Sequence, residues 1–218
     1  MMATFDERAG EWDTAERVAR AEQVADAVIT AVAIPDGTRA IELGAGTGLL
    51  GLAIRDGVGS ERLAELVLSD PSTGMLAVAE RKIRDRGLAG VSTARFDLVA
   101  DPPPPGAPFD LALSVLMLHH VEDTAAALRA VRDLLVPGGR LALADLDTED
   151  GTFHTAEAEG IHHHGFDRDR LRTLGAEAGL DDVRVGTAGT FERDGRTYPL
   201  FLLVARRAWP SGGATGPA

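Results

Sequence analysis

The apolar residues of the chain follow two periods, one typical of helices and one typical of buried strands. The helical period appears first in Val18, Ala21, Ala25, Val28 and Val32, which are spaced by three and four residues. This spacing places apolar side chains on one face of an amphipathic helix. The residues that follow are 34–37, Ile-Pro-Asp-Gly, a sequence that ends helices. An amphipathic helix is therefore predicted ahead of the first strand.

Short apolar runs and helical patterns alternate through the middle of the chain. Runs typical of buried strands lie at residues 40–43, 66–69, 91–96, 111–116 and 140–144. Helical spacing follows in Leu76, Ala79 and Ile83, in Leu128, Val131 and Leu135, and in Leu171, Leu174 and Ala178. Strands that alternate with helices are typical of a parallel sheet that is covered on both faces.

The last part of the chain has a different pattern. Residues 183–191 and 198–205 are strand-like, and residues 192–196 between them are too few for a crossover helix. We therefore expect an antiparallel hairpin at the sheet edge. The predicted fold is α/β, a Rossmann-like doubly wound sheet of seven strands, mostly parallel, with an antiparallel C-terminal hairpin. We divide the chain into an N-terminal lid segment and helix (1–38), a main domain (39–207) and a flexible tail (208–218).

Two segments inside the main domain have neither period. Residues 101–106 form a stiff proline-rich loop between the third and fourth strands. Residues 147–166 hold four of the six histidines. Long irregular loops in compact domains usually carry function, so this second segment is a candidate part of a site.

The composition excludes several classes of function. The 218 residues include 22 Lys and Arg against 34 Asp and Glu, and the net charge of −12 provides no basic field for nucleic acid. Without cysteine, disulfides, thiolate metal sites and a cysteine nucleophile are excluded. The first residues hold no secretory apolar core, and no apolar run is long enough to cross a membrane. We expect a cytoplasmic monomer or homodimer, with no membrane or nucleic-acid partner.

Three glycines, Gly44, Gly46 and Gly48, alternate directly after the first predicted strand and before a helix. Glycine permits a tight turn there and exposes backbone amides at a helix N-terminus, where doubly wound sheets bind ligands. Leu49 departs from the glycine pattern of dinucleotide-binding folds. Glu42 favours a ligand with positive charge and would repel a pyrophosphate. Taken alone, the loop is equally consistent with a structural turn.

Carboxylates follow the next two predicted strands. Asp70 comes 22 residues after Gly48, at the place where a carboxylate accepts both hydroxyls of a ribose. Asp97 follows the third strand, where a carboxylate would recognise an exocyclic amine. Each could instead be a solvated acid or cap the next helix. Three such features at successive strand ends favour one shared nucleotide-type site.

Five runs follow one another in the chain: IELGAGTGLLGLAI, VLSDPSTGMLAVAERK, ARFDLV, FDLALSVLMLHHVED and LRAVRDLLVPGGRLALADL. In this order they resemble the successive motifs of class I S-adenosylmethionine-dependent methyltransferases, and the resemblance extends over about residues 5–207. The opening FDERAGEWD is similar to the start of small-molecule methyltransferases of the ubiquinone-biosynthesis type. The resemblance implies that the main domain binds S-adenosyl-L-methionine as its cofactor.

The resemblance also implies which residues contact the cofactor. The glycine loop would lie against the methionine part, with Glu42 near the ammonium through water. The implied set comprises Glu42, Gly44, Ala45, Gly46 and Gly48 at the methionine part, Asp70 with the adjacent Pro71 at the ribose, Met75, Asp97 and Leu98 at the adenine, and Ser114 and Val115 at the methyl group.

Two neighbouring histidines, His119 and His120, are the catalytic candidates. Methyl transfer from a sulfonium is an in-line displacement that needs alignment and exclusion of water, and it does not strictly require a catalytic residue. A neutral hydroxyl acceptor must nevertheless lose a proton, and histidine is the usual base. In the family this segment lines the acceptor pocket. Either histidine could instead be structural, and the sequence does not select between them.

The loop histidines have three interpretations. Residues 145–154 and 161–166 resemble a subgroup of these methyltransferases that carries paired EDG-x-FH and HHHGF segments. His154, His162 and His164 are the candidate acceptor-binding residues. With Asp147 or Glu149 they would alternatively hold a divalent metal, although the spacing matches no established ligand motif. The third interpretation is a solvated polar loop, and our expectation is that no metal binds.

Trp12, together with Phe5, would form part of a lid over cofactor and acceptor, or would merely anchor the first helix. The sequence thus predicts an enzyme that transfers a methyl group from S-adenosyl-L-methionine to a small-molecule acceptor, mainly by positioning, with or without a histidine base. Two alternatives stay open: an NAD-dependent Rossmann reductase, and a non-catalytic S-adenosylmethionine-binding sensor or partner protein.

Overall fold

The computed structural model describes residues 2–154 and 160–210. The helices are α1 (Met2–Arg8), α2 (Ala15–Ala31), α3 (Leu49–Val58), α4 (Thr73–Arg86), α5 (Thr124–Asp133) and α6 (Arg168–Glu177), with the short 3₁₀ turns η1 (Ala9–Glu11) and η2 (Leu118–His120). The strands are β1 (Thr38–Leu43), β2 (Leu63–Asp70), β3 (Val91–Arg95), β4 (Phe109–Val115), β5 (Leu135–Leu146), β6 (Leu180–Arg193) and β7 (Arg196–Arg207). Each predicted strand is present.

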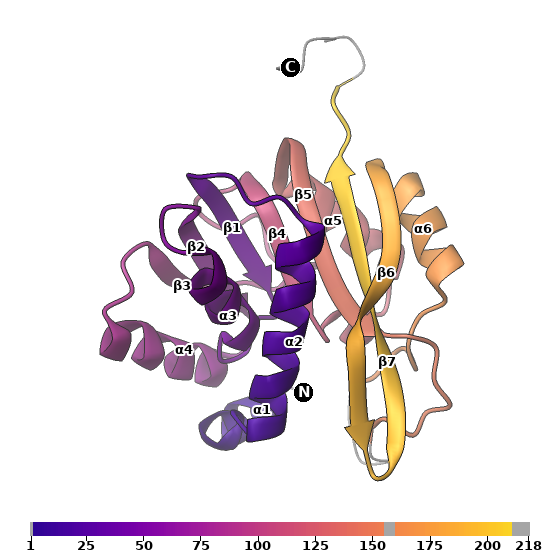
Figure 1. Ribbon diagram of the computed structural model, residues 1–218, viewed down its shortest axis with the longest axis horizontal. Helices are drawn as coiled ribbons and strands as arrows, with labels where there is room; N and C mark the ends of the chain where they lie inside the picture. Colours follow the sequence, from indigo (N-terminus) through magenta and orange to yellow (C-terminus); the bar gives the residue numbers. More distant parts are fainter. Residues whose placement is uncertain (1, 155–159, 211–218) are drawn as a thin grey trace.

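The strands form one seven-stranded sheet in the order β3-β2-β1-β4-β5-β7-β6. Strands β1 to β5 are parallel, whereas β7 pairs antiparallel with both β5 and β6. The predicted fold class is confirmed. The carboxyl ends of the parallel strands meet at one edge, the lower edge in Figure 1, and α1 lies there. We call this the carboxyl edge.

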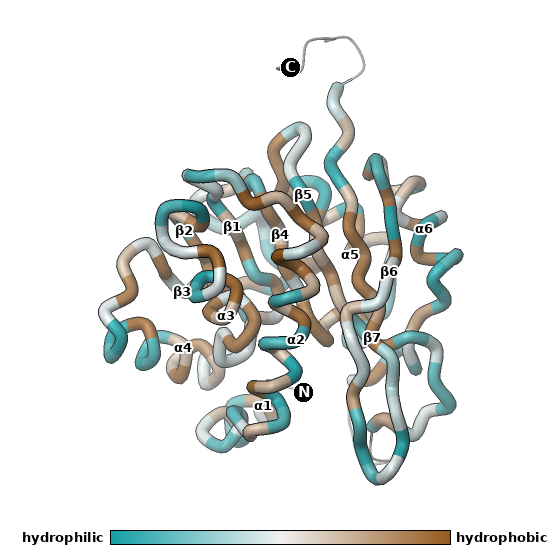
Figure 2. The backbone as a smooth tube through the Cα atoms, viewed as in Figure 1, coloured by the Kyte–Doolittle hydropathy of each residue, from teal (hydrophilic) through white to brown (hydrophobic). Residues whose placement is uncertain are grey.

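Apolar residues cover both faces of the sheet. One core packs α2, α3 and α4 against it, and includes Val28, Leu52 and Leu66. The other packs α5 and α6 on the opposite face, and includes Leu128 and Leu171. Figure 2 shows the central strands as mostly hydrophobic and the tip of the β6–β7 hairpin as hydrophilic. Among the described residues, no helix is both long and apolar enough to span a membrane.

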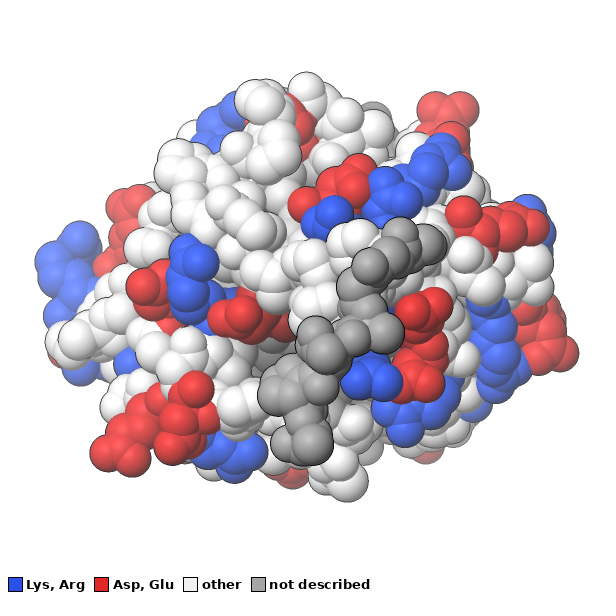
Figure 3. All heavy atoms as spheres, turned by 90° about the horizontal axis from the view of Figure 1, so that it is seen from above, with Lys and Arg blue, Asp and Glu red and all other residues white. Residues whose placement is uncertain are grey.

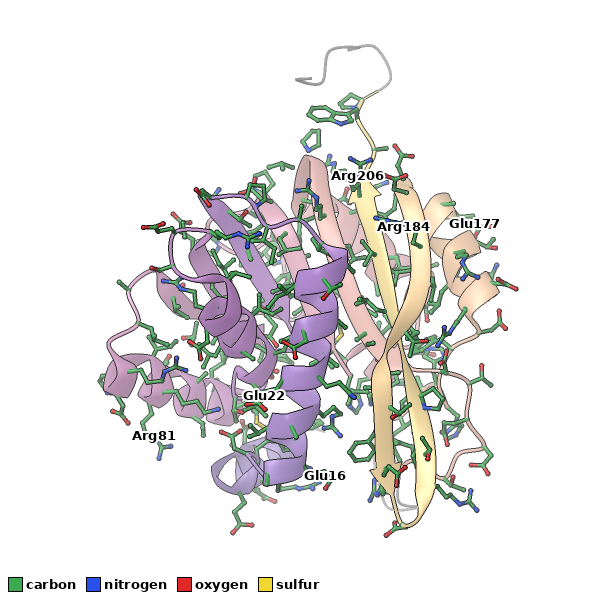
Figure 4. All side chains as sticks on the ribbon, in the orientation of Figure 1. Glu16, Glu22, Arg81, Glu177, Arg184 and Arg206 are labelled. Atoms are coloured by element: carbon green, nitrogen blue, oxygen red, sulfur yellow. The ribbon has the colours of Figure 1, made fainter. Side chains whose placement is uncertain are left out.

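Helix α2 confirms the helix expected from the first apolar pattern. Thr14 caps its N-terminus by accepting a hydrogen bond from the Arg17 amide, 3.3 Å away. The helix ends at Ala31, a few residues before Pro35. Its outer face carries acidic side chains, of which Glu16 and Glu22 are labelled in Figure 4.

One predicted helix was too long. We expected Leu135 to continue the pattern of Leu128 and Val131, but α5 ends at Asp133 and Leu135 begins β5. Leu135 pairs with Phe109 of β4 and is fully buried. Pro137 disfavours helical geometry in the residue before it, so the apolar residues after Asp133 extend the strand instead.

The irregular segments lie as expected between elements. Residues 101–106 belong to the connection between β3 and β4, which holds no helix. Asp147 and Phe166 form an isolated parallel bridge across the histidine-rich loop. Residues 155–159 of that loop, and residues 211–218 of the expected tail, lie outside the described residues.

Candidate functional site at the carboxyl edge

The glycine loop connects β1 to α3 at the carboxyl edge. Gly44, Gly46 and Gly48 have φ angles of +65°, +55° and +81°, which favour glycine. A Cβ atom at Gly44 would lie 2.5 Å from the Met117 Cγ, so no other residue fits there without displacing that side chain. The Ala45 amide donates to the Ser69 carbonyl at 2.9 Å, which joins the loop to β2. The loop therefore has a fixed shape, with backbone partly exposed at Gly44 and Gly46.

Asp70, at the end of β2, holds the loop and the start of α4 together. Its Oδ2 accepts from the Gly46 amide and its Oδ1 from the Ser72 amide, both at 2.8 Å. Only 9% of Asp70 is exposed, and this burial raises the pKa of its carboxyl above the usual value. Each oxygen accepts one hydrogen bond here and has a lone pair left for a ligand hydroxyl.

Glu42 lies beneath the loop, where it is 1% exposed. Its Oε2 accepts from the Gly51 amide of α3 at 2.9 Å. Burial raises the pKa of Glu42 to about 8, against smaller lowering effects from this hydrogen bond and from Lys82. A positive charge bound in the site above Glu42 would therefore favour the ionised form of this carboxyl.

The remaining predicted cofactor residues lie at neighbouring strand ends. Asp97, half-buried after β3, accepts from the amides of Val99 at 3.0 Å and Ala100 at 3.1 Å. The Ser114 hydroxyl donates to the Leu43 carbonyl at 2.9 Å and so joins the ends of β4 and β1. The others are Pro71 after β2, Met75 in the first turn of α4, Leu98 beside Asp97 and Val115 at the end of β4.

Residues 5–14, the N-terminal segment, cover the glycine loop. The Trp12 Nε1 is 3.7 Å from the position of a Cβ at Gly46, and the Arg17 guanidinium stacks 4.0 Å from the Trp12 ring centroid. Asp13 accepts from the Thr47 hydroxyl and pairs with the Lys82 ammonium, both at 2.5 Å. The predicted position of Trp12 over the loop fits both a lid and a helix anchor.

A second carboxylate of the N-terminal segment binds the start of α4. Asp6 Oδ1 accepts from the Ser72 hydroxyl at 2.6 Å and from the Gly74 amide at 2.7 Å. These bonds hold the pKa of Asp6 below its usual value. Sequence reasoning did not find Asp6, Asp13 or Lys82, because their partners are far away in the chain.

Three histidines gather beside the loop, and we call His119, His120 and His154 the histidine cluster. The ring centroid of His119 lies 4.2 Å from that of His120 and 4.8 Å from that of His154. The Phe5 ring meets His120 edge-on at 5.6 Å. Burial lowers the pKa of His120 and lowers that of His154 to about 4. Nε2 of His154 is buried and has no hydrogen-bond partner among the described residues.

Asp145, which sequence reasoning also missed, holds His119 from the end of β5. Its Oδ1 lies 2.8 Å from His119 Nδ1, and its Oδ2 accepts from the His119 amide at 3.2 Å. Both side chains are buried. The signal that could have found it is its place at a strand end, in line with Asp70 and Asp97.

The other predicted loop histidines lie differently. His162 is exposed, although its amide donates to the His119 carbonyl at 2.9 Å. His164 is also exposed, and its Nδ1 is 3.4 Å from Glu149 Oε1. His163 Nε2 lies 3.0 Å from the Val121 carbonyl, which indicates a structural role. Within residues 2–154 and 160–210, no three His, Asp or Glu side chains are placed to hold a metal ion.

Two surface hollows lie away from this edge. One of about 270 Å³ includes Pro35 and Arg140 at the amino ends of the strands, and one of about 560 Å³ includes Asp26 and Arg184 between α2 and β6. Neither contains a predicted site residue. Figure 3 looks on the amino-end edge, where acidic and basic side chains are interspersed. The predicted site residues described above lie instead at the carboxyl edge, which the N-terminal segment covers.

Comparison with known proteins identifies the family. Residues 41–141 match a family described as a methyltransferase domain. The ubiquinone/menaquinone biosynthesis C-methyltransferase UbiE of Shewanella oneidensis is 30% identical over 174 residues, covering 67% of this chain and 68% of that protein. The chain belongs to the class I S-adenosylmethionine-dependent methyltransferases. It is an enzyme of transferase type, its cofactor is S-adenosylmethionine, and the NAD-dependent reductase and the non-catalytic sensor are set aside.

Solved structures share the fold of this methyltransferase. A chain of the complex between the Haloferax volcanii Trm112 methyltransferase activator and the putative methyltransferase has a TM-score of 0.72 at 18% identity, over 94% of this chain and 98% of that chain. An S-adenosylmethionine-dependent methyltransferase from Aquifex aeolicus has a TM-score of 0.66 at 17% identity, over 92% and 97%. At these identities the likeness concerns the fold alone.

Proposed function

We propose that the enzyme methylates a small molecule held between the glycine loop and the histidine cluster. One observation carries this proposal: the Phe5 ring lies 5.7 Å from Trp12, which covers Gly46, and 5.6 Å from His120. The side chain of Phe5 thus packs against both Trp12 above the glycine loop and His120 of the histidine cluster. The N-terminal segment lies over this edge, and a covered site suits a small acceptor better than a polymer. The UbiE relative, a quinone-biosynthesis enzyme by name, also supports a small acceptor.

The residues at the carboxyl edge fit S-adenosylmethionine. A side chain at Gly44 would collide with Met117, so backbone is what the loop presents to a ligand. Asp70 and Asp97 suit a cation that also carries two ribose hydroxyls and an amine, and a cation bound above the buried Glu42 would favour ionisation of that carboxyl, whose pKa is about 8. We assign the methionine part to the glycine loop with Glu42, Ala45 and Gly48, the ribose to Asp70 and Pro71, the adenine to Met75, Asp97 and Leu98, and the methyl group to Ser114 and Val115.

The protein's own task in the reaction is alignment. The bound cofactor supplies an activated methyl group, so the chain must orient the acceptor and exclude water. Trp12 and Phe5 exclude water from above the loop, and Ser114 fixes the end of β4 through its bond to Leu43. The histidine cluster forms the acceptor's wall. His162 and His164 are exposed, and we assign them to the rim of this pocket.

Labelled methyl transfer tests the proposal. S-adenosylmethionine with a labelled methyl group is incubated with the enzyme and with separate small-molecule, protein and nucleic-acid fractions of a cell extract. We expect label in the small-molecule fraction only, and we expect its transfer to fall in His119→Ala or His120→Ala. Label in protein or nucleic acid would contradict the small-molecule acceptor. The control is Asp133→Asn, a change of an exposed residue on α5 that lies away from the site.

A further inference from the structure

A buried carboxylate fixes the orientation of one histidine of the cluster. Asp145 is completely buried. Besides the contact with the His119 ring, its carboxylate oxygens accept hydrogen bonds from the backbone amides of His119 and Leu146. When the carboxylate is ionised, the ring nitrogen 2.8 Å from it must donate. A neutral His119 therefore carries its hydrogen on Nδ1 and a lone pair on Nε2. No described residue offers a hydrogen bond to that Nε2.

The His119 backbone is fixed as firmly as its ring. Its carbonyl accepts from the amides of His162 at 2.9 Å and His163 at 3.3 Å, so the histidine-rich loop is attached to it. On the other side, the side chain of Met117, two residues earlier, fills the space beside Gly44 of the glycine loop. His119 thus stands between the glycine loop and the histidine-rich loop, with its ring held in place.

The charged and titratable neighbours favour His119 over the other two histidines. The charges of His119, Asp145 and His162 act on His120, and those of Glu149 and Arg193 act on His154. Burial lowers the pKa of His120 and that of His154, and among the described residues neither ring has a hydrogen bond to a carboxylate. Within the part of the chain that the structure describes, His119 alone of the three has a carboxylate within hydrogen-bond distance of its ring, so it is the one histidine of the cluster that a charged partner orients.

We propose that His119 is the proton acceptor of methyl transfer and that Asp145 is its positioning residue. The inference rests on the proposed function, because it assumes an acceptor in contact with the histidine cluster. The acceptor's bond to hydrogen breaks, and its proton goes to Nε2 of His119. The released electron pair forms the bond to the methyl carbon, and the pair of the broken carbon–sulfur bond stays on sulfur. The acceptor is therefore a weak acid that is neutral before it binds.

The position of the ring hydrogen is the first test, and it needs no acceptor. Imidazole ¹⁵N chemical shifts distinguish a hydrogen on Nδ1 from one on Nε2. We expect neutral His119 of the wild type to carry it on Nδ1, and Asp145→Asn to lose this preference. A hydrogen on Nε2 in the wild type would overturn the proposal, and this result does not depend on whether a variant folds.

Proton transfer to His119 is the second test, with 4-nitrophenol as the probe. The protein is saturated with S-adenosylhomocysteine at a pH below the pKa of the free phenol, and the nitrophenolate absorption band is recorded. We expect the wild type to ionise the bound phenol, and His119→Ala and Asp145→Asn to reduce the ionised fraction at least about tenfold. Asp133→Asn, a matched change on the surface of α5, should leave the band unchanged. With a purely structural histidine, every variant would show the same band as the free phenol at that pH.

Titration with S-adenosylhomocysteine separates this inference from the proposed function. A wild type that binds neither S-adenosylhomocysteine nor the phenol contradicts the proposed function itself. A wild type that binds both but shows no more nitrophenolate than the free phenol, or an Asp145→Asn protein that shows as much as the wild type, overturns the His119–Asp145 pair alone. If Asp145→Asn does not fold, His119→Ala and the wild-type ¹⁵N measurement decide.

Discussion

At the scale of single residues, the buried Glu42 beneath the glycine loop makes the stability of the folded protein depend on pH. Its carboxyl has a pKa of about 8 in the folded protein against 4.5 for the ordinary group. The folded state binds the proton of Glu42 more tightly than the unfolded state does. The protonated carboxyl therefore contributes its full stabilisation of the folded state below about pH 4.5, and this contribution is lost as pH rises toward 8. The expected loss is on the order of a few kcal/mol.

Glu42→Gln tests this effect. The variant keeps an oxygen for the Gly51 amide and cannot ionise, so it should lose stability less steeply than the wild type between pH 5 and 8. Urea unfolding of both proteins, without cofactor, measures the difference at each pH. Parallel stability curves would show that Glu42 does not carry its proton into the folded state.

His154 gives a second prediction at this scale. Its buried Nε2 has no partner among the described residues, and an unsatisfied buried nitrogen costs about 1–3 kcal/mol. His154→Phe keeps a ring beside Phe153 and removes that nitrogen, so we expect unchanged or higher stability and a weaker affinity for the acceptor. Thermal unfolding and the KM for the acceptor measure the two effects. A loss of stability above about 2 kcal/mol would indicate that the nitrogen has a partner.

Some of these residues could be predicted from the sequence and others could not, depending on whether their contacts are local in the chain. The glycine loop and the acids at strand ends could be predicted, because a strand, a turn and a helix in sequence place them locally. Asp145 could not be paired with His119, nor Asp13 with Lys82, because each pair meets only after distant segments pack. Hydrogen bonding between such side chains depends on the assembled sheet and leaves no spacing signal.

At the scale of elements, the N-terminal segment is a clamp attached at two points. Asp6 binds the start of α4, and Asp13 binds Lys82 and Thr47, so two carboxylates hold the segment against the rest of the site. The Asp13–Lys82 pair is partly exposed, and pairs of this kind contribute up to about 1 kcal/mol. Removing it should therefore loosen the segment without unfolding the protein.

Asp13→Asn tests the clamp through the rate of ligand release. Trp12 is the reporter in a Trp209→Phe background, because these are the two tryptophans of the chain. We expect stopped-flow fluorescence to show S-adenosylhomocysteine leaving about two to five times faster than from the parent. Asp56→Asn, which removes an exposed pair with Arg86 on the same side of the sheet, should not change the rate. Equal release from both variants would mean that the segment does not gate the cofactor.

Element ends were harder to predict than elements. The strands and helices followed from apolar spacing, but Leu135 was assigned to α5 when it begins β5. Helical and strand periods both place an apolar residue at that position, and only its pairing with Phe109 decides between them. The antiparallel hairpin, in contrast, was predictable, because a connection of a few residues cannot cross the sheet.

At the scale of the whole molecule, the sheet order brings the site together. Placing β1 and β4 side by side puts the glycine loop beside η2, and adding β2 next to β1 and β3 next to β2 brings Asp70 and Asp97 to the same edge. Part of the net charge of −12 is therefore located at the site, because a few acidic side chains gather where a cationic cofactor is proposed to bind. Most of the remaining charge lies on the surface.

The central claim is that S-adenosylmethionine binds at this edge with its ribose on Asp70. Calorimetric titration with S-adenosylhomocysteine, comparing the wild type with Asp70→Asn and the surface control Asp133→Asn, tests it most directly. We predict binding to the wild type and to the control, at least about tenfold weaker binding to Asp70→Asn, and no binding of NADH. Unchanged affinity of Asp70→Asn, or binding of NADH in place of S-adenosylhomocysteine, would contradict the account.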